Sequence, residues 1–458
     1  MKEFKDCRNP VLPTYLHIPD PEAHVMPDGR VYVYGSWDQY DDDTFCSKEY
    51  RVISSANMVD WVDHGKSFDS SHIDWIFDPG KVEYPKVDWD WENPTPFMKK
   101  IIEKYLNKQN QEKIETENEH SKKSSNLSPD LLYAPDAIHR NGKYYLYFCA
   151  QDDSEGVAVS DRPEGPFKNP VRLPCGGIDP SVFIDDDGQA YYYWGQLRAS
   201  GAKLKDNMIE FEEGSIVNRI VTEEEHGFHE GSSVRKRNGI YYFVYSGINR
   251  GKATSLAYST SESPLGPFEY KGIIIDNNGC DPQSWNNHGS IEEVNGQWYV
   301  FYHRNSRNQK NRRRLCIEPI TFNEDGTITE VQMTSQGAGR PFNIGEKIDA
   351  YRACELFGSV YIYPLNGDYE GLIGIQNGDT AIFRYVDWKQ GPCAVSIEAK
   401  GSGEIQIYLD NQSDLAGSIK VCNGAIVSSY FQGTAGMHEV KLTFHRASDL
   451  EIYSICFN

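Results

Sequence analysis

The chain has 458 residues, a length that indicates two domains rather than one. Aromatic residues make up 13% of it and include 29 tyrosines, many in alternating runs, which favours strands over helices. The formal net charge of −21 argues against nucleic acid and anionic membranes as partners, and suits a neutral substrate such as a sugar.

The compartment is indicated by the N-terminus and the cysteines. Residues 1–13 contain no apolar run of the signal-peptide type, and no segment approaches the length of a transmembrane helix. The ten cysteines show no C-x-x-C spacing, and several lie inside expected strands, where a thiol packs as a small apolar group. Their even number permits disulfides, but a chain of this size needs none. We therefore expect reduced thiols and a cytoplasmic protein.

Five short turns, each followed by an aromatic strand, recur along the first three quarters of the chain. Each is an Asn-Gly or Asp-Gly pair flanked by alternating apolar residues, as in a β-hairpin, with the glycines at Gly29, Gly142, Gly188, Gly239 and Gly296. The last three intervals, of 46, 51 and 57 residues, fit four-stranded propeller blades. We predict a five-bladed β-propeller over residues 1–335.

The first interval, of 113 residues, contains an insertion at about residues 67–128. Residues 97–126 begin as an amphipathic helix and continue as a charged tract poor in apolar residues, which is either a solvated surface excursion or a lid over a pocket. The front of the insertion carries Trp75, Phe77, Trp89 and Trp91, whose rings either stack on a sugar or pack beneath the loop.

The remaining quarter of the chain predicts a second all-β domain. A small, polar stretch at residues 334–339 reads as a linker. Residues 342–458 alternate in short strands separated by turn signals, at the spacing of a β-sandwich of jelly-roll type.

Upstream of each turn glycine lies a strand with one ionisable residue, and these are Asp20, Asp136, Asp179, Glu230 and His288. If the five units are arranged radially, these strands line one axis, where four carboxylates and an imidazole converge. Burial and mutual repulsion push the pKa values of such carboxyls apart, so that one stays ionised and another keeps its proton. Glycoside hydrolysis requires such a pair.

Three of these motifs resemble those of glycoside hydrolase family 43: HIPDPEAHV around Asp20, GGIDPSVF around Asp179 and FHEGSSVRK around Glu230. The resemblance covers about residues 9–335 and implies an inverting enzyme that removes arabinofuranose or xylose from plant cell-wall glycans. It implies that Asp20 is the general base, that Asp179 tunes and orients the acid, and that Glu230 protonates the leaving group. A lone Asp before proline is more often a turn former, but three acids on equivalent strands favour catalysis.

The resemblance also assigns the residues around these acids. Asp136, in the A-P-D-A-I element, either contacts substrate or serves as a structural cap. Tyr133 stands where the family usually has a tryptophan that stacks on the sugar. Arg304 either contacts substrate or holds Glu230. His288 matches a histidine that contacts calcium directly or through water, so we expect Ca²⁺ at the propeller axis, the alternative being hydrogen bonds to the catalytic acids.

The C-terminal domain weakly resembles carbohydrate-binding modules of family 6. That likeness implies a structural calcium at Glu355. The usual loop lacks a clear aromatic pair, so the domain either binds glycan or only buttresses the propeller.

The expected activity is that of an exo-acting, inverting α-L-arabinofuranosidase on arabinoxylo- or arabino-oligosaccharides. The alternative is a β-D-xylosidase, or one enzyme with both activities, whereas an endo-arabinanase is disfavoured because the insertion would close the groove into a pocket. Retaining fructosidases share the propeller but carry N-D-P-N-G and R-D-P elements, and neither occurs here. A binding propeller without catalysis is the third class.

Overall fold

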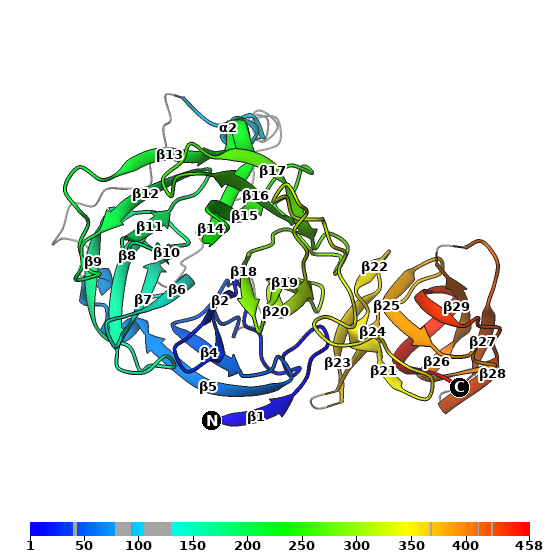
Figure 1. Ribbon diagram of the computed structural model, residues 1–458. Coiled ribbons are helices and arrows are strands. Elements are labelled where there is room, and N and C mark those ends of the chain that lie inside the picture. Colours follow the sequence, from blue (N-terminus) through cyan, green and yellow to red (C-terminus); the bar gives the residue numbers. More distant parts are fainter. Residues whose placement is uncertain (40–43, 78–92, 105–129, 367–368, 411, 423–424) are drawn as a thin grey trace, which may run out of the picture.

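The computed structural model describes residues 1–39, 44–77, 93–104, 130–366, 369–410, 412–422 and 425–458. Five antiparallel sheets stand around one axis, and a sixth sheet forms a domain beside them (Figure 1). The predictions of an all-β chain and of a five-bladed propeller are therefore confirmed.

Each propeller blade is a consecutive meander. Blade I contains β2 (Glu22–Val25), β3 (Val31–Gly35), β4 (Glu49–Ser55) and β5 (Asp60–Asp69), with β1 (Lys2–Lys5) added at its outer edge. Blade II contains β6 (Leu132–Arg140), β7 (Lys143–Ala150), β8 (Ser154–Ser160) and β9 (Lys168–Gly176). Blade III contains β10 (Ser181–Ile184), β11 (Ala190–Trp194), β12 (Arg198–Leu204) and β13 (Val217–Thr222). Blade IV contains β14 (Phe228–Arg237), β15 (Ile240–Gly247), β16 (Ser255–Ser261) and β17 (Glu269–Asp276), and blade V contains β18 (Gly289–Val294), β19 (Gln297–Ser306) and β20 (Gln309–Pro319).

The predicted hairpins join the first two strands of every blade. At the three Asn-Gly turns both residues have positive φ: 51° and 75° at Asn141 and Gly142, 51° and 81° at Asn238 and Gly239, and 54° and 82° at Asn295 and Gly296. This is the backbone of a type I′ turn, which asparagine and glycine tolerate best. The strands before these turns, β2, β6, β10, β14 and β18, contact one another and line the axis (Figure 1).

The ring is closed by the N-terminus. The amide of Val11 donates to the carbonyl of Leu315 at 3.0 Å, and the Asn9 side chain accepts from the amide of Ile317 at 2.8 Å, so residues 9–11 cover the free edge of β20. Each pair of neighbouring blades shares one buried apolar cluster. Because these clusters fill the space between blades, the axis is left for polar side chains.

Short helices lie in the connections between propeller strands: η1 (Ser70–His72), η2 (Asp74–Phe77) and α2 (Glu223–His226). Residues 96–104 are also helical. The Trp75 ring stacks on Phe148 at 6.2 Å between centroids, and its indole N–H donates to Ser154 Oγ at 2.9 Å. Trp75 therefore packs beneath its loop. Trp89, Trp91 and residues 105–126 lie outside the described residues.

The C-terminal domain is one curled sheet of nine strands. They are β21 (Lys347–Asp349), β22 (Glu355–Phe357), β23 (Tyr361–Asn366), β24 (Tyr369–Ile373), β25 (Thr380–Trp388), β26 (Ala394–Leu409), β27 (Gly417–Cys422), β28 (Ala425–Tyr430) and β29 (Gly436–Phe457), with η3 (Ala350–Arg352) between β21 and β22. The two longest, β26 and β29, pair along most of their length with register shifts between residues 398 and 404. Such bulges bend the strands, so that the sheet wraps around one apolar core as a sandwich does.

All ten cysteines are free thiols, in agreement with the expectation from their spacing. Within the described ranges, none of the helices has the length and apolar character needed to cross a bilayer.

Candidate active site

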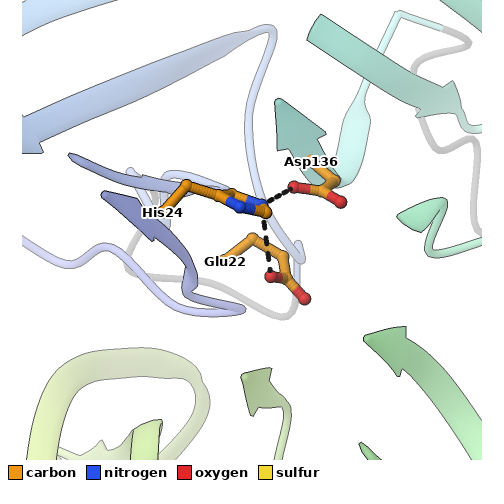
Figure 2. A group of neighbouring side chains, drawn as sticks. All are labelled: Glu22, His24 and Asp136. Carbon is orange, nitrogen blue, oxygen red and sulfur yellow. Dashed lines mark hydrogen bonds and ion pairs between the residues drawn. The ribbon is translucent and has the colours of Figure 1, made fainter. Parts of the chain in front are cut away.

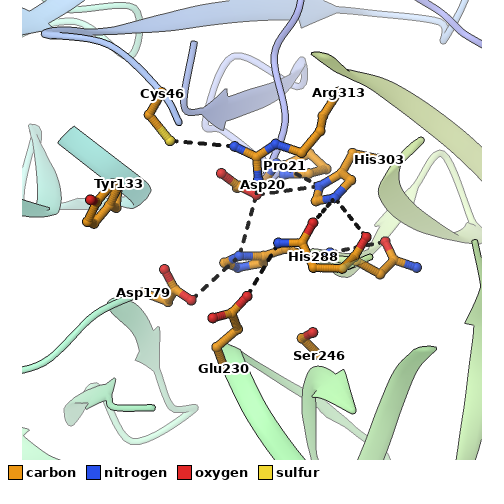
Figure 3. Close-up of polar contacts among 12 residues, drawn as sticks. Asp20, Pro21, Cys46, Tyr133, Asp179, Glu230, Ser246, His288, His303 and Arg313 are labelled. Atoms are coloured by element: carbon orange, nitrogen blue, oxygen red, sulfur yellow. Dashed lines mark hydrogen bonds and ion pairs between the residues drawn. The ribbon is translucent and has the colours of Figure 1, made fainter. Parts of the chain in front are cut away.

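A pocket of about 300 Å³ opens at the axis of the propeller. It is lined by Asp20, Phe45, Cys46, Tyr133, Ala134, Gln151, Asp153, Ile178, Asp179, Gln196, Glu230, Trp285, Asn286, His288 and Arg313. These residues come from all five blades, and the three predicted catalytic acids are among them (Figure 3).

Asp20 and Asp179 occupy equivalent positions and share an unusual backbone. Each directly precedes a proline, which is followed by the first strand of its blade, and each has a φ of 56°. Aspartate is among the few residues that tolerate this left-handed region, and a following proline disfavours helical backbone further. Backbone strain of this kind concentrates at functional sites, and here it occurs twice in one pocket.

Asp20 is held as a carboxylate. Burial by itself raises the pKa of Asp20, but Arg313, His303 and His288 together outweigh burial and hold the pKa well below its usual range. The Arg313 guanidinium donates to Asp20 Oδ1 at 2.9 Å, while its other nitrogens donate to both oxygens of the buried Asp38 at 3.0 Å. Because Asp38 anchors Arg313 on two sides, the cation is fixed beside Asp20.

His288 lies between Asp20 and Asp179 (Figure 3). Its Nδ1 is 3.8 Å from Asp20 Oδ1 and 3.8 Å from Asp179 Oδ2. Burial lowers the pKa of His288, which favours a neutral ring. Burial and the negative charges of Glu230 and Asp20 raise the pKa of Asp179 well above its usual value. Ionisation of Asp179 is therefore disfavoured while Asp20 and Glu230 carry negative charge.

Glu230 is positioned by amides. Gln196 Nε2 donates to Glu230 Oε2 at 2.9 Å, and Asn286 Nδ2 donates to Oε1 at 3.4 Å. The pairing of β14 with β15 shifts register on both sides of Glu230, which marks an irregularity where the side chain leaves the regular strand pattern. His229 Nε2 also lies 3.8 Å from Glu230 Oε2, so two amides and an imidazole surround this carboxyl and orient it.

The walls of the pocket combine polar and aromatic groups. Tyr133 lies across the pocket from His303 (Figure 3), and its hydroxyl donates to Gln151 Oε1. Phe45 and Trp285 pack against each other with ring centroids 5.3 Å apart. Aromatic faces next to hydrogen-bonding side chains are the usual lining of a sugar site.

Comparison with known proteins identifies the family. Residues 106–328 match the glycosyl hydrolases family 43. Xylosidase/arabinosidase 43A of Humicola insolens is 30% identical over 69% of this chain and 97% of its own length. This chain belongs to family 43. It is a glycoside hydrolase, as predicted from its motifs.

Other relatives cover the whole chain or add structures. A xylosidase/arabinosidase of Thermoclostridium stercorarium is 29% identical over 98% of both chains. The structure of CoXyl43, a family 43 β-xylosidase/α-arabinofuranosidase from a compost metagenome, matches with 28% identity and a TM-score of 0.53 over 72% of this chain and 99% of its own. An arabinoxylan arabinofuranohydrolase of Bacillus subtilis, at 23% identity and a TM-score of 0.50, covers 98% of this chain and 97% of its own, and so shares the two-domain fold.

Asp136 is buried near the axis but is not among the residues that line the pocket. Its carboxylate accepts from the amides of Ala137 at 2.6 Å and Val182 at 2.7 Å, and His24 Nε2 lies 2.7 Å from Oδ1 (Figure 2). Asp136 thus ties the first strands of blades I, II and III together. Of the two roles expected for it, this position fits the structural cap and not the contact with substrate.

Arg304 is not brought to the pocket either. Its guanidinium donates to the Thr334 carbonyl and, at 3.1 Å, to the Tyr302 hydroxyl. The physical reason is strand alternation: His303 faces the axis, with Nδ1 3.4 Å from Asp20 Oδ1, so the next side chain points the opposite way. The expectation that Arg304 contacts substrate or holds Glu230 is therefore corrected.

Arg313, which the motifs did not single out, is the arginine that lines the pocket, and it binds Asp20. The signal for it was the run Arg312, Arg313 and Arg314 in β20, because alternation in a strand must turn one of them toward the axis. The amides of Gln196 and Asn286 carried no comparable signal.

Within the part of the chain that the structure describes, one buried cluster could hold a metal ion: Glu22, His24 and Asp136, whose ligand atoms lie within 4.8 Å of one another (Figure 2). Burial lowers the pKa of His24 to about 4, so its ring is neutral, as metal binding requires. Among the described residues Glu22 Oε1 has no hydrogen-bond partner. The cluster fits a cation, although Arg235, which donates to Glu22 Oε2 at 3.1 Å, already supplies one positive charge.

Glu355, the expected calcium ligand of the C-terminal domain, does not fit a metal. Its two oxygens lie 2.9 and 3.0 Å from two nitrogens of Arg384, so the carboxylate already has a cation. The expectation of a calcium site at Glu355 is not supported by this geometry.

Proposed function

We propose that this enzyme is an exo-acting, inverting glycosidase that removes α-L-arabinofuranosyl groups from arabinoxylo- or arabino-oligosaccharides. The observation that carries the proposal is the asymmetry of the pocket. Asp20 is paired with the Arg313 cation, whereas Glu230 accepts from the neutral amide of Gln196 and acts on Asp179, whose pKa is raised by burial and by the charges of Glu230 and Asp20. An ionised carboxylate facing a protonated site is what inversion requires.

In the proposed mechanism Glu230 gives its proton to the glycosidic oxygen as the bond to the anomeric carbon breaks. Asp20 orients a water molecule on the opposite face of the sugar and takes its proton as the new C–O bond forms, which inverts the anomeric centre. Asp179 lies beside both groups and, through its proton and charge, keeps Glu230 ready to act as an acid. His288 holds Asp20 and Asp179 at a fixed separation.

The substrate class is supported by the relatives. They are named xylosidase/arabinosidase or arabinoxylan arabinofuranohydrolase, and CoXyl43 was solved with xylotriose. The same names favour β-D-xylosidase activity as the second candidate, alone or together with the first. Hydrolysis of 4-nitrophenyl α-L-arabinofuranoside and β-D-xylopyranoside discriminates between them.

Two isosteric variants test the catalytic assignment. Asp20→Asn and Glu230→Gln each remove one proton-transferring group, and each is expected to lower kcat/KM by about 10²- to 10⁴-fold without changing the circular dichroism spectrum. Asp206→Asn, at a position exposed on the propeller surface, serves as the control. Wild-type activity in either variant, or retention of the anomeric configuration seen by NMR, would contradict the proposal.

We also propose that a divalent cation, with calcium as the ion implied by the family resemblance, binds at the propeller axis. Glu22, His24 and Asp136 would hold it, and it would offset their buried negative charge. A chelator is then expected to lower the thermal midpoint, and added Ca²⁺ to restore it. No effect of chelation on either midpoint or activity would count against the ion.

A further inference from the structure

Asp153 stands apart from the other carboxyls of the pocket. It lies in the turn between β7 and β8, lines the cavity and has a φ of 64°. Its amide donates to the carbonyl of Ala150 at 2.9 Å, and its own carbonyl accepts from the amide of Gly177 at 2.9 Å. The backbone is therefore fixed on both sides, and the carboxyl group has a defined place in the wall.

The carboxylate of Asp153 lacks a partner within the part of the chain that the structure describes. No described side chain forms a hydrogen bond or ion pair with it, whereas the neighbouring Asp152 accepts from the Ser154 hydroxyl at 2.6 Å. Partial burial, followed by the charge of Asp152, raises the pKa of Asp153 to about 6. A desolvated carboxyl without a partner costs free energy, which a ligand that donates hydrogen bonds would offset.

The surroundings define the chemistry of that ligand. The negative charge of Asp153 acts on the nearby Tyr133, and the Tyr133 hydroxyl donates a hydrogen bond to Gln151. These three side chains therefore form one polar wall of the pocket. Arg313 is already paired with Asp20 and Asp38. A carboxylate beside neutral donors and acceptors suits a polyhydroxylated, uncharged molecule, because its oxygens accept from two adjacent hydroxyls at once.

The position of Asp153 also indicates which sugar unit of the substrate it would contact. The segment whose amide binds the Asp153 carbonyl begins at Gly177, two residues before Asp179. Asp153 is therefore tied to the strand end that carries one of the three acids, beside the reacting centre. We propose that Asp153 determines specificity by accepting hydrogen bonds from hydroxyls of the terminal sugar that is cleaved off. This inference rests on the proposed function, and it explains how the pocket selects the sugar that is cleaved off.

The test compares Asp153→Asn and Asp153→Ala with wild type on the two nitrophenyl glycosides. A lost hydrogen bond to a charged acceptor corresponds to about a 10- to 100-fold fall in kcat/KM, and it should change the ratio between arabinoside and xyloside. Substrates lacking one hydroxyl supply the sharper readout. Wild type should lose about tenfold or more at the contacted hydroxyl, whereas Asp153→Asn should lose much less at that same position.

Asp152→Asn is the matched control, because it removes the same charge from the same turn and keeps the oxygen that accepts from Ser154. It should leave the deoxygenation pattern of wild type unchanged. If Asp153→Asn folds, keeps wild-type kcat/KM and shows the wild-type penalty at every hydroxyl, the role of Asp153 is rejected. That outcome would leave the catalytic assignment intact, since the Glu230→Gln variant tests it separately.

Discussion

A single buried carboxyl shows how the propeller handles charge outside the pocket. Glu155, on β8, is fully buried, and its Oε2 accepts from the hydroxyl of Tyr192 and from Cys175 Sγ at 3.3 Å. Burial raises the pKa of Glu155 to about 8, even though these two hydrogen bonds act in the opposite direction. Near neutral pH the folded chain therefore keeps a proton that the unfolded chain has released.

This proton makes stability depend on pH. The folded-state pKa lies above the unfolded value of about 4.3, so the stabilisation from Glu155 is complete below pH ~4 and is lost as pH rises toward 8. Glu155→Gln has no proton to lose. Its thermal midpoint, measured relative to wild type from pH 5 to 9, is expected to rise with pH and to level off above about 8. The exposed Glu213→Gln should show a constant difference, and a constant difference for Glu155→Gln would refute the protonation.

At the scale of elements, one glycine of β14 follows Glu230 directly and lies against the ring of His288. Gly231 follows Glu230 with a φ of 79°, and a Cβ added there would lie 3.1 Å from the His288 ring. An alanine at this position must therefore strain the backbone and displace His288. Gly239, at the end of the same hairpin, has a φ of 81° and open space around it.

This contrast gives a paired prediction. Gly231→Ala and Gly239→Ala should each cost about 1 kcal/mol or more through the backbone alone. Only Gly231→Ala should also lower kcat, by up to about 100-fold, because it moves His288 away from its place between Asp20 and Asp179. Thermal unfolding and steady-state kinetics on both variants measure the two effects. Equal kcat values in the two variants would show that the position of His288 is not critical.

The elements also show what the sequence could and could not predict. The five hairpins were visible because Asn-Gly and Asp-Gly turns are local signals. The equivalence of the three acids followed from their equal distance to each turn glycine. Asp136 precedes its turn glycine by six residues, whereas Asp20, Asp179 and Glu230 precede theirs by nine. Three residues of a strand span about 10 Å, which explains why Asp136 does not line the pocket. The run of three arginines could have placed one of them at the axis, but the pairing of Arg313 with Asp38, 275 residues away, leaves no local signal.

For the whole molecule, the central question is what the second domain does. Glu370, on β24, is fully buried, and its two oxygens bind Arg307 at 3.1 Å and Arg314 at 2.8 Å, both in or next to the edge strands of blade V. Cys354 and Ile382 of the same domain belong to the apolar cluster between blades IV and V. We therefore propose that this domain buttresses the propeller, which is one of the two roles expected for it.

This role predicts that the interface matters for folding whether or not the domain binds glycan. Glu370→Ala removes the carboxylate that the buried Arg314 shares with the partly buried Arg307, which is expected to cost about 3–5 kcal/mol. Asp387→Ala removes a partly exposed pair with Lys389 from the same domain and should change stability by less than about 1 kcal/mol. Denaturant unfolding followed by tyrosine and tryptophan fluorescence measures both variants. Because Arg314 neighbours Arg313 in β20, Glu370→Ala should also lower activity at temperatures below its unfolding transition. A stable, fully active Glu370→Ala enzyme would instead indicate that the two domains fold and work independently.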